Sequence, residues 1–137
     1  MLGRIWCALY IAGRKNAELC QDGPYSLVRN PLYVFSFVGA LGVALATQRP
    51  LLVPIVAALF VAYYHIVIRA EETRLAALFP AAYPAYRREV PRALPRLTGY
   101  RSRERLTLDP ADVARAMREV VWFAAAFAAA VALGRFV

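Results

Sequence analysis

Two apolar runs lie close together near the middle of the chain, and they restrict its fold more than any other feature. Residues 32–47 carry no charge and are rich in small side chains, and residues 51–68 form a second apolar run. Gln48-Arg49-Pro50, between them, has the composition of a tight turn. Each run would form a helix of about 25 Å at ~1.5 Å per residue, adequate for a thin membrane. The pattern predicts a transmembrane helical hairpin.

The composition supports a membrane protein. The chain has 137 residues, enough for one domain, and 61% of them are hydrophobic. That share is too high for a soluble domain of this size. The net charge is +8, but nearly all the basic residues are arginines that adjoin the apolar runs. We therefore interpret them as juxtamembrane positive charge and predict no nucleic-acid partner.

Helix signals predict where the hairpin begins and ends. Pro31 suits the first turn of a helix, because its fixed φ is helical and its missing N–H is not needed there. The second helix is expected to continue past Glu71 and Glu72 to Phe79, where Pro80 stops it.

The rest of the chain contains shorter or more polar segments. Residues 2–12 are apolar but too short to span a bilayer, so they form an interfacial helix or the end of a longer span. Residues 83–96 are rich in tyrosine, arginine and proline and are expected to lie along the membrane interface. Asp109-Pro110 resembles an N-cap followed by proline at the first helical position. The helix that begins there is wholly apolar over residues 120–133, which predicts a third span.

The distribution of positive charge predicts the orientation of the hairpin. Arg14, Lys15 and Arg29 precede it and an arginine-rich segment follows it, whereas the connecting turn has only Arg49. The positive-inside rule therefore places both feet of the hairpin in the cytoplasm.

A polar cluster is expected at these feet. Arg29 and Asn30 come directly before the hairpin, and Glu71 and Glu72 come directly after it. Charged groups at the depth of a membrane face are costly unless they bind something. The sequence therefore predicts a ligand site there.

Cysteine and histidine give little sign of a metal site. Cys7 and Cys20 form no CxxC pair and have no histidine nearby, so we predict neither a metal centre nor a disulfide framework. His65, the single histidine, lies two residues after Tyr63 in an apolar run. We interpret it as a polar residue that hydrogen-bonds between helices, with a functional role as the alternative.

Several motifs together resemble a known family. They are, in order, Gly23-Pro24-Tyr25-x-x-x-Arg29-Asn30-Pro31-x-Tyr33, the hairpin, Glu71-Glu72-x-x-Leu75-x-x-x-Phe79, Tyr83-x-x-Tyr86 and Val90-Pro91-Arg92. Their order and spacing, over about residues 19–95, resemble the isoprenylcysteine carboxyl methyltransferases. These are small integral-membrane enzymes that use S-adenosylmethionine and are related to phospholipid N-methyltransferases.

The resemblance implies an all-α integral membrane protein with a transmembrane hairpin, a C-terminal span and interfacial helices. It divides a single domain, residues 1–137, into an N-terminal interfacial segment and motif loop (1–30), the hairpin (31–68), a cytoplasmic segment that covers the cofactor (69–108) and a C-terminal helix (109–137). It also implies that S-adenosylmethionine binds at the cytoplasmic face. The positions that fall at the family's cofactor contacts are Leu19, Cys20, Tyr25, Asn30, Pro31, Leu32, Tyr33 and Glu71. Arg29 and Glu72 flank them and are the catalytic candidates.

The chemistry of these side chains agrees with that cofactor. S-adenosylmethionine carries a sulfonium, an ammonium, a carboxylate and an adenine. Glu71 is an anion for the positive groups, and Arg29 is a donor for the carboxylate. Tyr25, Tyr33 and Asn30 suit the adenine. A tyrosine face can also hold the cationic methyl-sulfonium group.

Each of these residues also has a simpler interpretation. Arg29 would serve as a positive-inside anchor, and Tyr25 and Tyr33, like Tyr83 and Tyr86, as members of an interfacial aromatic belt. Glu71 and Glu72 would then form a solvated helix end, paired by helical spacing with Arg74 or Arg69.

Two positions depart from the family pattern. Asn30 stands where the enzymes that act on prenylated proteins usually have histidine, and an amide does not titrate near neutral pH. Val67 stands where they have the arginine that holds the acceptor carboxylate. Arg69 or Arg74 is the substitute in this sequence, so the acceptor is the part that the resemblance defines least.

The leading hypothesis is an S-adenosylmethionine-dependent methyltransferase with a membrane lipid or lipidated acceptor. The acceptor is either the carboxylate of an isoprenylcysteine-like or other lipidic substrate, or a phospholipid amine, for which Glu72 would act as base. The alternative is an N-terminally truncated, non-catalytic membrane relative that binds lipid or a partner protein. A third possibility is a reductase of the membrane sterol type.

Overall fold

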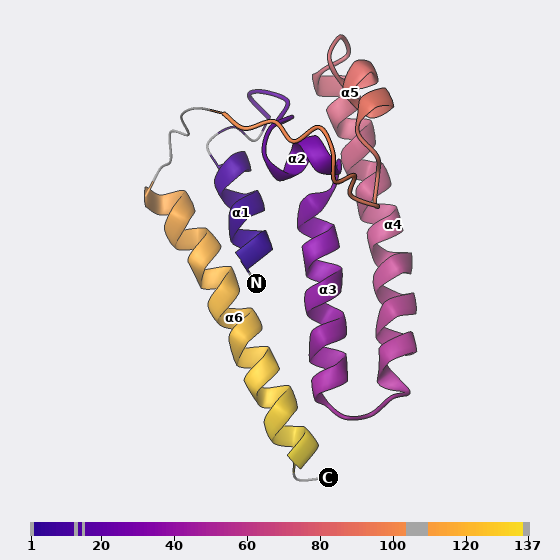
Figure 1. The fold of residues 1–137 in the computed structure, drawn as a ribbon, viewed down its shortest axis with the longest axis vertical. Helices are drawn as coiled ribbons and strands as arrows, with labels where there is room; N and C mark the ends of the chain where they lie inside the picture. Colours follow the sequence, from indigo (N-terminus) through magenta and orange to yellow (C-terminus); the bar gives the residue numbers. More distant parts are fainter. Residues whose placement is uncertain (1, 13, 15, 104–109, 136–137) are drawn as a thin grey trace.

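The computed structural model describes residues 2–12, 14, 16–103 and 110–135, with the backbone alone for residues 119 and 133–135. Six helices occur in these residues: α1 (Leu2–Ile11), α2 (Pro24–Leu27), α3 (Pro31–Ala46), α4 (Leu52–Leu78), α5 (Tyr83–Glu89) and α6 (Pro110–Arg135). The described residues contain no strand. Figure 1 shows α3, α4 and α6 along the length of the molecule, with α2 and α5 at one end. The chain is an all-α membrane protein, as predicted.

Helices α3 and α4 form the predicted hairpin (Figure 1). Helix α3 begins at Pro31, and α4 ends at Leu78 with Phe79 as its C-cap, so both predicted ends are confirmed. In the turn, Gln48 has a φ of 57°, a left-handed conformation that a reversal of the chain over so few residues requires. The hairpin brings residue 30 and residue 71 to the same end of the molecule.

Helix α4 has the length and composition of a membrane span. It contains 27 residues, and no residue of its most apolar stretch is buried. Of the helices in the described residues, α4 is the one that passes this test, whereas α1 and α3 are shorter apolar helices. Residues such as Leu59 and Ile66 are exposed on its surface, which lipid would solvate better than water. The predicted helix α6 is present, and its crossing of the membrane, like that of α3, stays a prediction.

Helix α1 packs against both α3 and α6. Arg4 donates a hydrogen bond to Ser36 of α3, and its guanidinium carbon lies 4.9 Å from the ring centre of Phe123 on α6. Ser36 is buried and donates in turn to the Leu32 carbonyl at 2.6 Å. Polar links of this kind stabilise helix association where the surroundings are apolar. The short α1 is therefore an integral part of the bundle.

The segment after α5 is fastened across the feet of the hairpin (Figure 1). The Arg29 amide donates to the Pro91 carbonyl at 2.8 Å, and the Arg96 amide donates to the Leu27 carbonyl at 3.1 Å. Farther along, the Gly23 amide donates to the Arg101 carbonyl at 2.7 Å. These bonds pair backbone groups of loop residues, which have no partner within a helix. They also hold residues 90–103 over α2.

Gly23 is required where α2 begins. Its φ is +60°, and a Cβ at this position would lie 2.4 Å from a ring carbon of Tyr10. Any other L-residue would be strained by the backbone and would collide with the tyrosine. The glycine therefore allows α1 to pack closely under residues 19–30, which we call the motif loop.

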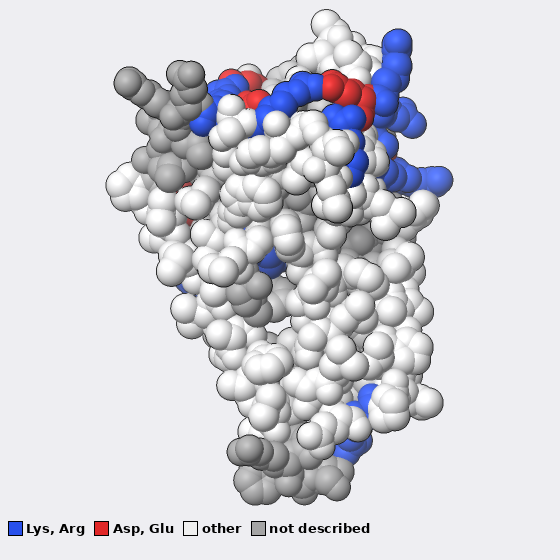
Figure 2. Space-filling view, viewed as in Figure 1, with Lys and Arg blue, Asp and Glu red and all other residues white. Residues whose placement is uncertain are grey.

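Charged side chains gather at the end of the molecule that holds α2 and α5. Figure 2 shows blue and red atoms concentrated there, while the length of the helices below is almost uncharged on this face. This separation matches a protein that spans the apolar layer with its helices and places its polar end in the interface. Asp109, the predicted N-cap of α6, lies outside the described residues.

Candidate functional site

A cavity of about 130 Å³ opens at the foot of the hairpin, between the motif loop and α4. We call it the polar cavity. All eight residues predicted to contact the cofactor line it: Leu19, Cys20, Tyr25, Asn30, Pro31, Leu32, Tyr33 and Glu71. Arg29 also lines it. The fold therefore brings together, from four segments of the chain, the residues that the sequence motifs singled out.

The polar cavity also has lining residues that the sequence did not suggest, namely Ile11, Asn16, Glu18, Leu75 and Tyr86. Leu75 and Tyr86 belong to the motifs, so their spacing was the available signal. Ile11 ends α1, and Asn16 and Glu18 lie in the connection after it, where no motif marks them. Their place depends on how α1 packs, and a pattern of residue types does not encode that.

Charge in the polar cavity is divided between acids and one base. Glu71 contributes a carboxylate on the α4 side, 3.9 Å from Arg74, as helical spacing predicted. Glu18 contributes a second carboxylate on the other side, 3.1 Å from Arg103 and 3.3 Å from Arg14. Arg29 is the basic residue in the lining. A ligand that carries both positive and negative groups matches this arrangement.

Glu72 lies outside the cavity lining and is held by two arginines. Its Oε1 accepts a hydrogen bond from Arg29 Nη1 at 2.9 Å and from Arg92 Nε at 3.1 Å, and its Oε2 accepts from Arg92 Nη2 at 2.6 Å. The Arg29 and Glu72 side chains are only 11% and 12% exposed. These three hydrogen bonds use most of the acceptor capacity of the Glu72 carboxylate. The geometry favours a positioning role for Glu72 over the proposed role as base.

Two buried tyrosines form the back of the polar cavity. Tyr86 of α5 donates a hydrogen bond from its hydroxyl to the Tyr25 carbonyl at 2.8 Å, which joins α5 to α2. Burial raises the pKa of both Tyr25 and Tyr86, and it also raises the pKa of the Cys20 thiol. These groups therefore stay neutral and present aromatic and apolar surface rather than charge.

Asn30 connects the motif loop to the segment after α5. It precedes Pro31 and is the N-cap of α3, but its side chain makes no capping bond. Its Nδ2 instead donates to the Arg92 carbonyl at 3.3 Å. Asparagine at an N-cap usually bonds to its own helix, but here the amide instead joins the residues before α3 to residue 92.

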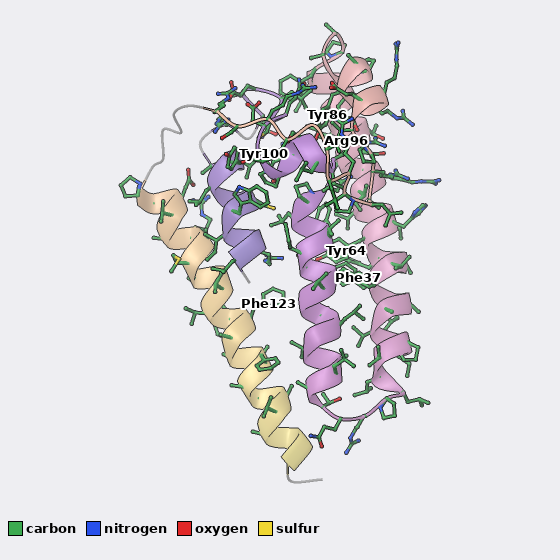
Figure 3. The ribbon with its side chains drawn as sticks, in the orientation of Figure 1. Phe37, Tyr64, Tyr86, Arg96, Tyr100 and Phe123 are labelled. Atoms are coloured by element: carbon green, nitrogen blue, oxygen red, sulfur yellow. The ribbon has the colours of Figure 1, made fainter. Side chains whose placement is uncertain are left out.

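A second cavity lies beside the first, between α3, α4 and residues 92–95. Its volume is about 380 Å³, and we call it the apolar groove. Its wall is aromatic: Tyr33 lies 4.8 Å from Tyr64 and Phe37 lies 5.2 Å from Phe60, measured between ring centres. Figure 3 shows Phe37 and Tyr64 in the space between α3 and α4. Asn30 and Tyr33 line both cavities, so the two adjoin.

Two sequence interpretations differ from what the structure shows. Arg69 and Arg74, the suggested substitutes at the acceptor side, line neither cavity, whereas Arg92 lines the apolar groove. His65 was interpreted as hydrogen-bonded between helices, but its side chain is exposed and makes no hydrogen bond with the described residues. Over the part of the chain that the structure describes, no group of three or more histidine, cysteine or acidic side chains is placed to hold a metal ion.

Comparisons with known proteins found two similar curated proteins, both named for metal resistance, and one matching family. Two curated relatives are each 42% identical over 122 residues, which is 89% of this chain. They are the cobalt-zinc-cadmium resistance protein CzcN of Cupriavidus metallidurans and the nickel-cobalt-cadmium resistance protein NccN of Alcaligenes xylosoxydans xylosoxydans. The chain covers 56% and 57% of their lengths.

No solved structure matches the chain. Residues 5–82 match the phospholipid methyltransferase family, and this match covers the motif loop, the hairpin, Glu71 and Glu72. The chain belongs to the phospholipid methyltransferase family.

Proposed function

We propose that this protein is an S-adenosylmethionine-dependent methyltransferase that acts on a membrane-associated lipidic acceptor. The observation that carries the proposal is the pair of adjoining cavities at the foot of the hairpin, one polar and one apolar, with Asn30 and Tyr33 in both linings. Methyl transfer needs two ligands held side by side, and orientation of this kind can lower a barrier by ~7 kcal/mol or more.

The residues of the polar cavity suit S-adenosylmethionine. Glu71 and Glu18 provide carboxylates for the ammonium and sulfonium groups, and Arg29 provides a cation for the carboxylate. Tyr25 and Tyr33 provide aromatic surface, and the Asn30 amide lies at the junction with the groove. The cavity is smaller than the ~300 Å³ or more of a typical small-molecule site. The cofactor would therefore extend past its rim toward the motif loop.

The apolar groove suits the acceptor. Its volume lies within the range of ~300–1000 Å³ that is usual for ligand sites. It is lined mainly by aliphatic and aromatic residues of α3 and α4, and α4 has the length and composition of a membrane span. A lipid tail in the groove would place its head group at the end where Asn30 and Tyr33 lie, beside the polar cavity.

The chain's own residues would position these ligands. When bound, S-adenosylmethionine supplies an electrophilic methyl group. Arg29 would orient its carboxylate while Glu72, through its ion pairs, fixes both Arg29 and Arg92. Arg92 lines the groove and would face the acceptor head group, in the place of the arginine that Val67 does not supply. The active face is proposed to be cytoplasmic, because the charged end carries most of the arginines.

The glutamate of the polar cavity provides the first test. Glu71→Gln should lower cofactor affinity about 10- to 100-fold, since it removes an ion pair with a charged ligand, and methyl transfer from labelled cofactor should fall below detection. The matched control is Glu89→Gln, an exposed, ion-paired glutamate of α5 outside both cavities. Affinity is measured by calorimetry in detergent. Unchanged affinity in Glu71→Gln would overturn the site assignment.

The acceptor distinguishes the two finer versions of the proposal. Methylation of a prenylated cysteine carboxylate would support an isoprenylcysteine carboxyl methyltransferase, and methylation of phosphatidylethanolamine would support a phospholipid amine enzyme. Both acceptors are offered to the reconstituted protein with labelled cofactor. Transfer to neither, with the cofactor still bound, would exclude both assignments.

A second candidate is a non-catalytic membrane relative. The names of the two curated relatives, which refer to metal resistance rather than to methylation, favour it. In this case the protein would bind lipid or a partner protein and would not bind the methyl donor. Calorimetry decides between the two, because absence of binding at millimolar S-adenosylmethionine supports the non-catalytic relative and contradicts the enzyme.

A further inference from the structure

The segment after α5 turns its charged side chains inward and its leucines outward. We call residues 91–103 the strap. Its four arginines share one property, an ion pair with an acid of the protein: Arg92 with Glu72, Arg96 and Arg101 with Glu89, and Arg103 with Glu18 and Asp22. Leu94 and Leu97, in contrast, are 83% and 93% exposed, and no large apolar side chain of the described residues is more exposed. A loop surrounded by water shows the opposite arrangement, because water solvates arginine well and leucine poorly.

The strap lies beside the membrane span. Ala93, Leu94 and Pro95 line the apolar groove together with Phe60 and Val61 of α4. These two α4 residues belong to its apolar part, well before Glu71 and Glu72. Figure 1 shows the chain descending beside α4 after α5, before it crosses toward α6. Leu94 therefore lies close to the part of the hairpin that an apolar layer surrounds.

The contacts on the inner side of the strap allow it to approach this layer. A charged side chain near an apolar layer is costly unless it is paired, and Arg92 Nη2 lies 2.6 Å from Glu72 Oε2. Backbone bonds to the motif loop, such as that from the Arg96 amide to the Leu27 carbonyl at 3.1 Å, hold the strap in place. The exposed residues between Arg92 and Thr98 are all apolar, namely Ala93, Leu94, Pro95 and Leu97. The outer side is thus an apolar patch on a fastened segment.

We propose that Leu94 and Leu97 form a lipid-contact surface, with their side chains inserted at the boundary between the head groups and the acyl chains of the bilayer around α4. Lipid acyl chains are the partner because the nearby arginines are already paired and because the patch continues the exposed apolar surface of α4, where Val61 is 59% exposed. Apolar surfaces of peripheral segments insert ~5–10 Å into this boundary. The inference rests on the membrane span of α4 and does not depend on methyl transfer.

The first test measures the surroundings of the strap directly. A nitroxide on Leu97→Cys is compared in phosphatidylcholine vesicles with one on Leu59→Cys of α4 and one on Arg88→Cys, an exposed position of α5. Collisions with oxygen, relative to those with a water-soluble nickel chelate, should be several-fold more frequent at Leu97 than at Arg88 and should approach those at Leu59. Wild type labelled in parallel gives the background from the two buried cysteines.

Two outcomes of this experiment overturn the inference. A probe at Leu97 that collides with the chelate as often as the probe at Arg88 shows that water covers the strap. A probe that is shielded from both oxygen and the chelate shows that protein covers it, and spectral broadening that disappears when labelled protein is diluted with unlabelled protein identifies a second copy of the chain.

The second test removes the apolar side chains. The double variant Leu94→Gln, Leu97→Gln should speed amide hydrogen exchange in the strap several-fold in phosphatidylcholine nanodiscs, because the strap loses its hold on the bilayer, while exchange in the middle of α4 stays unchanged. The matched control is Leu51→Gln, which changes a leucine that is 74% exposed at the opposite end of the hairpin. Equal strap exchange in the double variant and wild type overturns the inference. Neither test uses a methyl donor or acceptor, so both outcomes are independent of the proposed function.

Discussion

The two cavities at the foot of the hairpin differ in how they are built. The polar cavity draws its lining from the connection after α1, the motif loop, α4 and α5, and it contains acids, a base and buried tyrosines. The apolar groove is formed mainly by two neighbouring helices, α3 and α4, with a short cover from residues 92–95. The first is thus assembled from distant segments, and the second from one helical hairpin.

This difference has a consequence for function. A site built from many segments depends on tertiary contacts, such as the Glu72 ion pairs and the Tyr86 hydrogen bond, to keep its charges in place. A groove between two packed helices depends on side-chain shape alone, and different side chains would admit different tails. We therefore expect the polar cavity to fix the methyl donor and the groove to select the acceptor.

The largest effect is expected where the two cavities share a support. Glu72→Gln removes the carboxylate that pairs with Arg29 and Arg92. The two guanidiniums then lack their counter-charge, and the free energy of unfolding should fall by about 3 kcal/mol. Thermal unfolding with and without cofactor measures the loss. Donor affinity and acceptor turnover should both fall. A variant that loses only one of them would show that the cavities are supported independently.

A smaller effect is expected from the groove. Phe60→Ala removes an aromatic ring that contacts Phe37 and Tyr64, at 5.2 and 4.0 Å between ring centres. The KM for a long-tailed acceptor should rise about tenfold, since a lost apolar contact in a pocket is worth ~1–3 kcal/mol. Calorimetry should show unchanged donor affinity. A weaker donor affinity would contradict the division between the two cavities.

The shared wall should give a mixed result. Asn30→Ala removes an amide that lines both cavities and bonds to the Arg92 carbonyl. The loss of one such hydrogen bond, ~1 kcal/mol, should weaken the donor and raise the acceptor KM by a few-fold each. Steady-state kinetics with both ligands varied measures the two effects. An effect on the donor alone would contradict a contribution of Asn30 to both cavities.

The smallest effect concerns the buried tyrosine behind the polar cavity. Tyr86→Phe removes the hydrogen bond to the Tyr25 carbonyl and should lower stability by ~1 kcal/mol below pH 10. Burial raises the pKa of Tyr86 above its ordinary value of 10.0, so the folded protein keeps the proton that the unfolded chain loses. Wild-type stability should therefore fall as the pH rises above 10, and less steeply in the variant. Melting curves between pH 8 and 11 test this.

Much of the helical framework could be predicted from the sequence. Pro31, Pro80 and the turn at residues 48–50 marked the ends of α3 and α4, because proline and a short polar interruption act locally on the backbone. The eight predicted cofactor contacts were also correctly grouped, since they stand at fixed distances from the ends of the hairpin. Whether they bind the cofactor stays a prediction.

Other features could not be predicted because they depend on contacts between distant segments. Glu72 was predicted to be a catalytic candidate close to Arg29, with pairing inside its own helix as the simpler interpretation. In the structure it pairs with Arg29 and Arg92, 43 and 20 residues away, and nothing in the sequence pointed to Arg92 as a partner. His65 was expected to bond between helices, but its helix turns it toward the groove. Glu18 lines the polar cavity only because α1 packs against α3 and carries the connection after it to the motif loop.

The sequence by itself determined an all-α membrane protein with a cluster of polar side chains at the foot of its hairpin, because apolar length and local helix signals act along the chain. The tertiary structure decided that this foot holds two cavities rather than one, which residues they share, and which carboxylate is held by arginines. These are matters of packing between segments that lie far apart in sequence, and the side chains that meet there are chosen by the folded geometry.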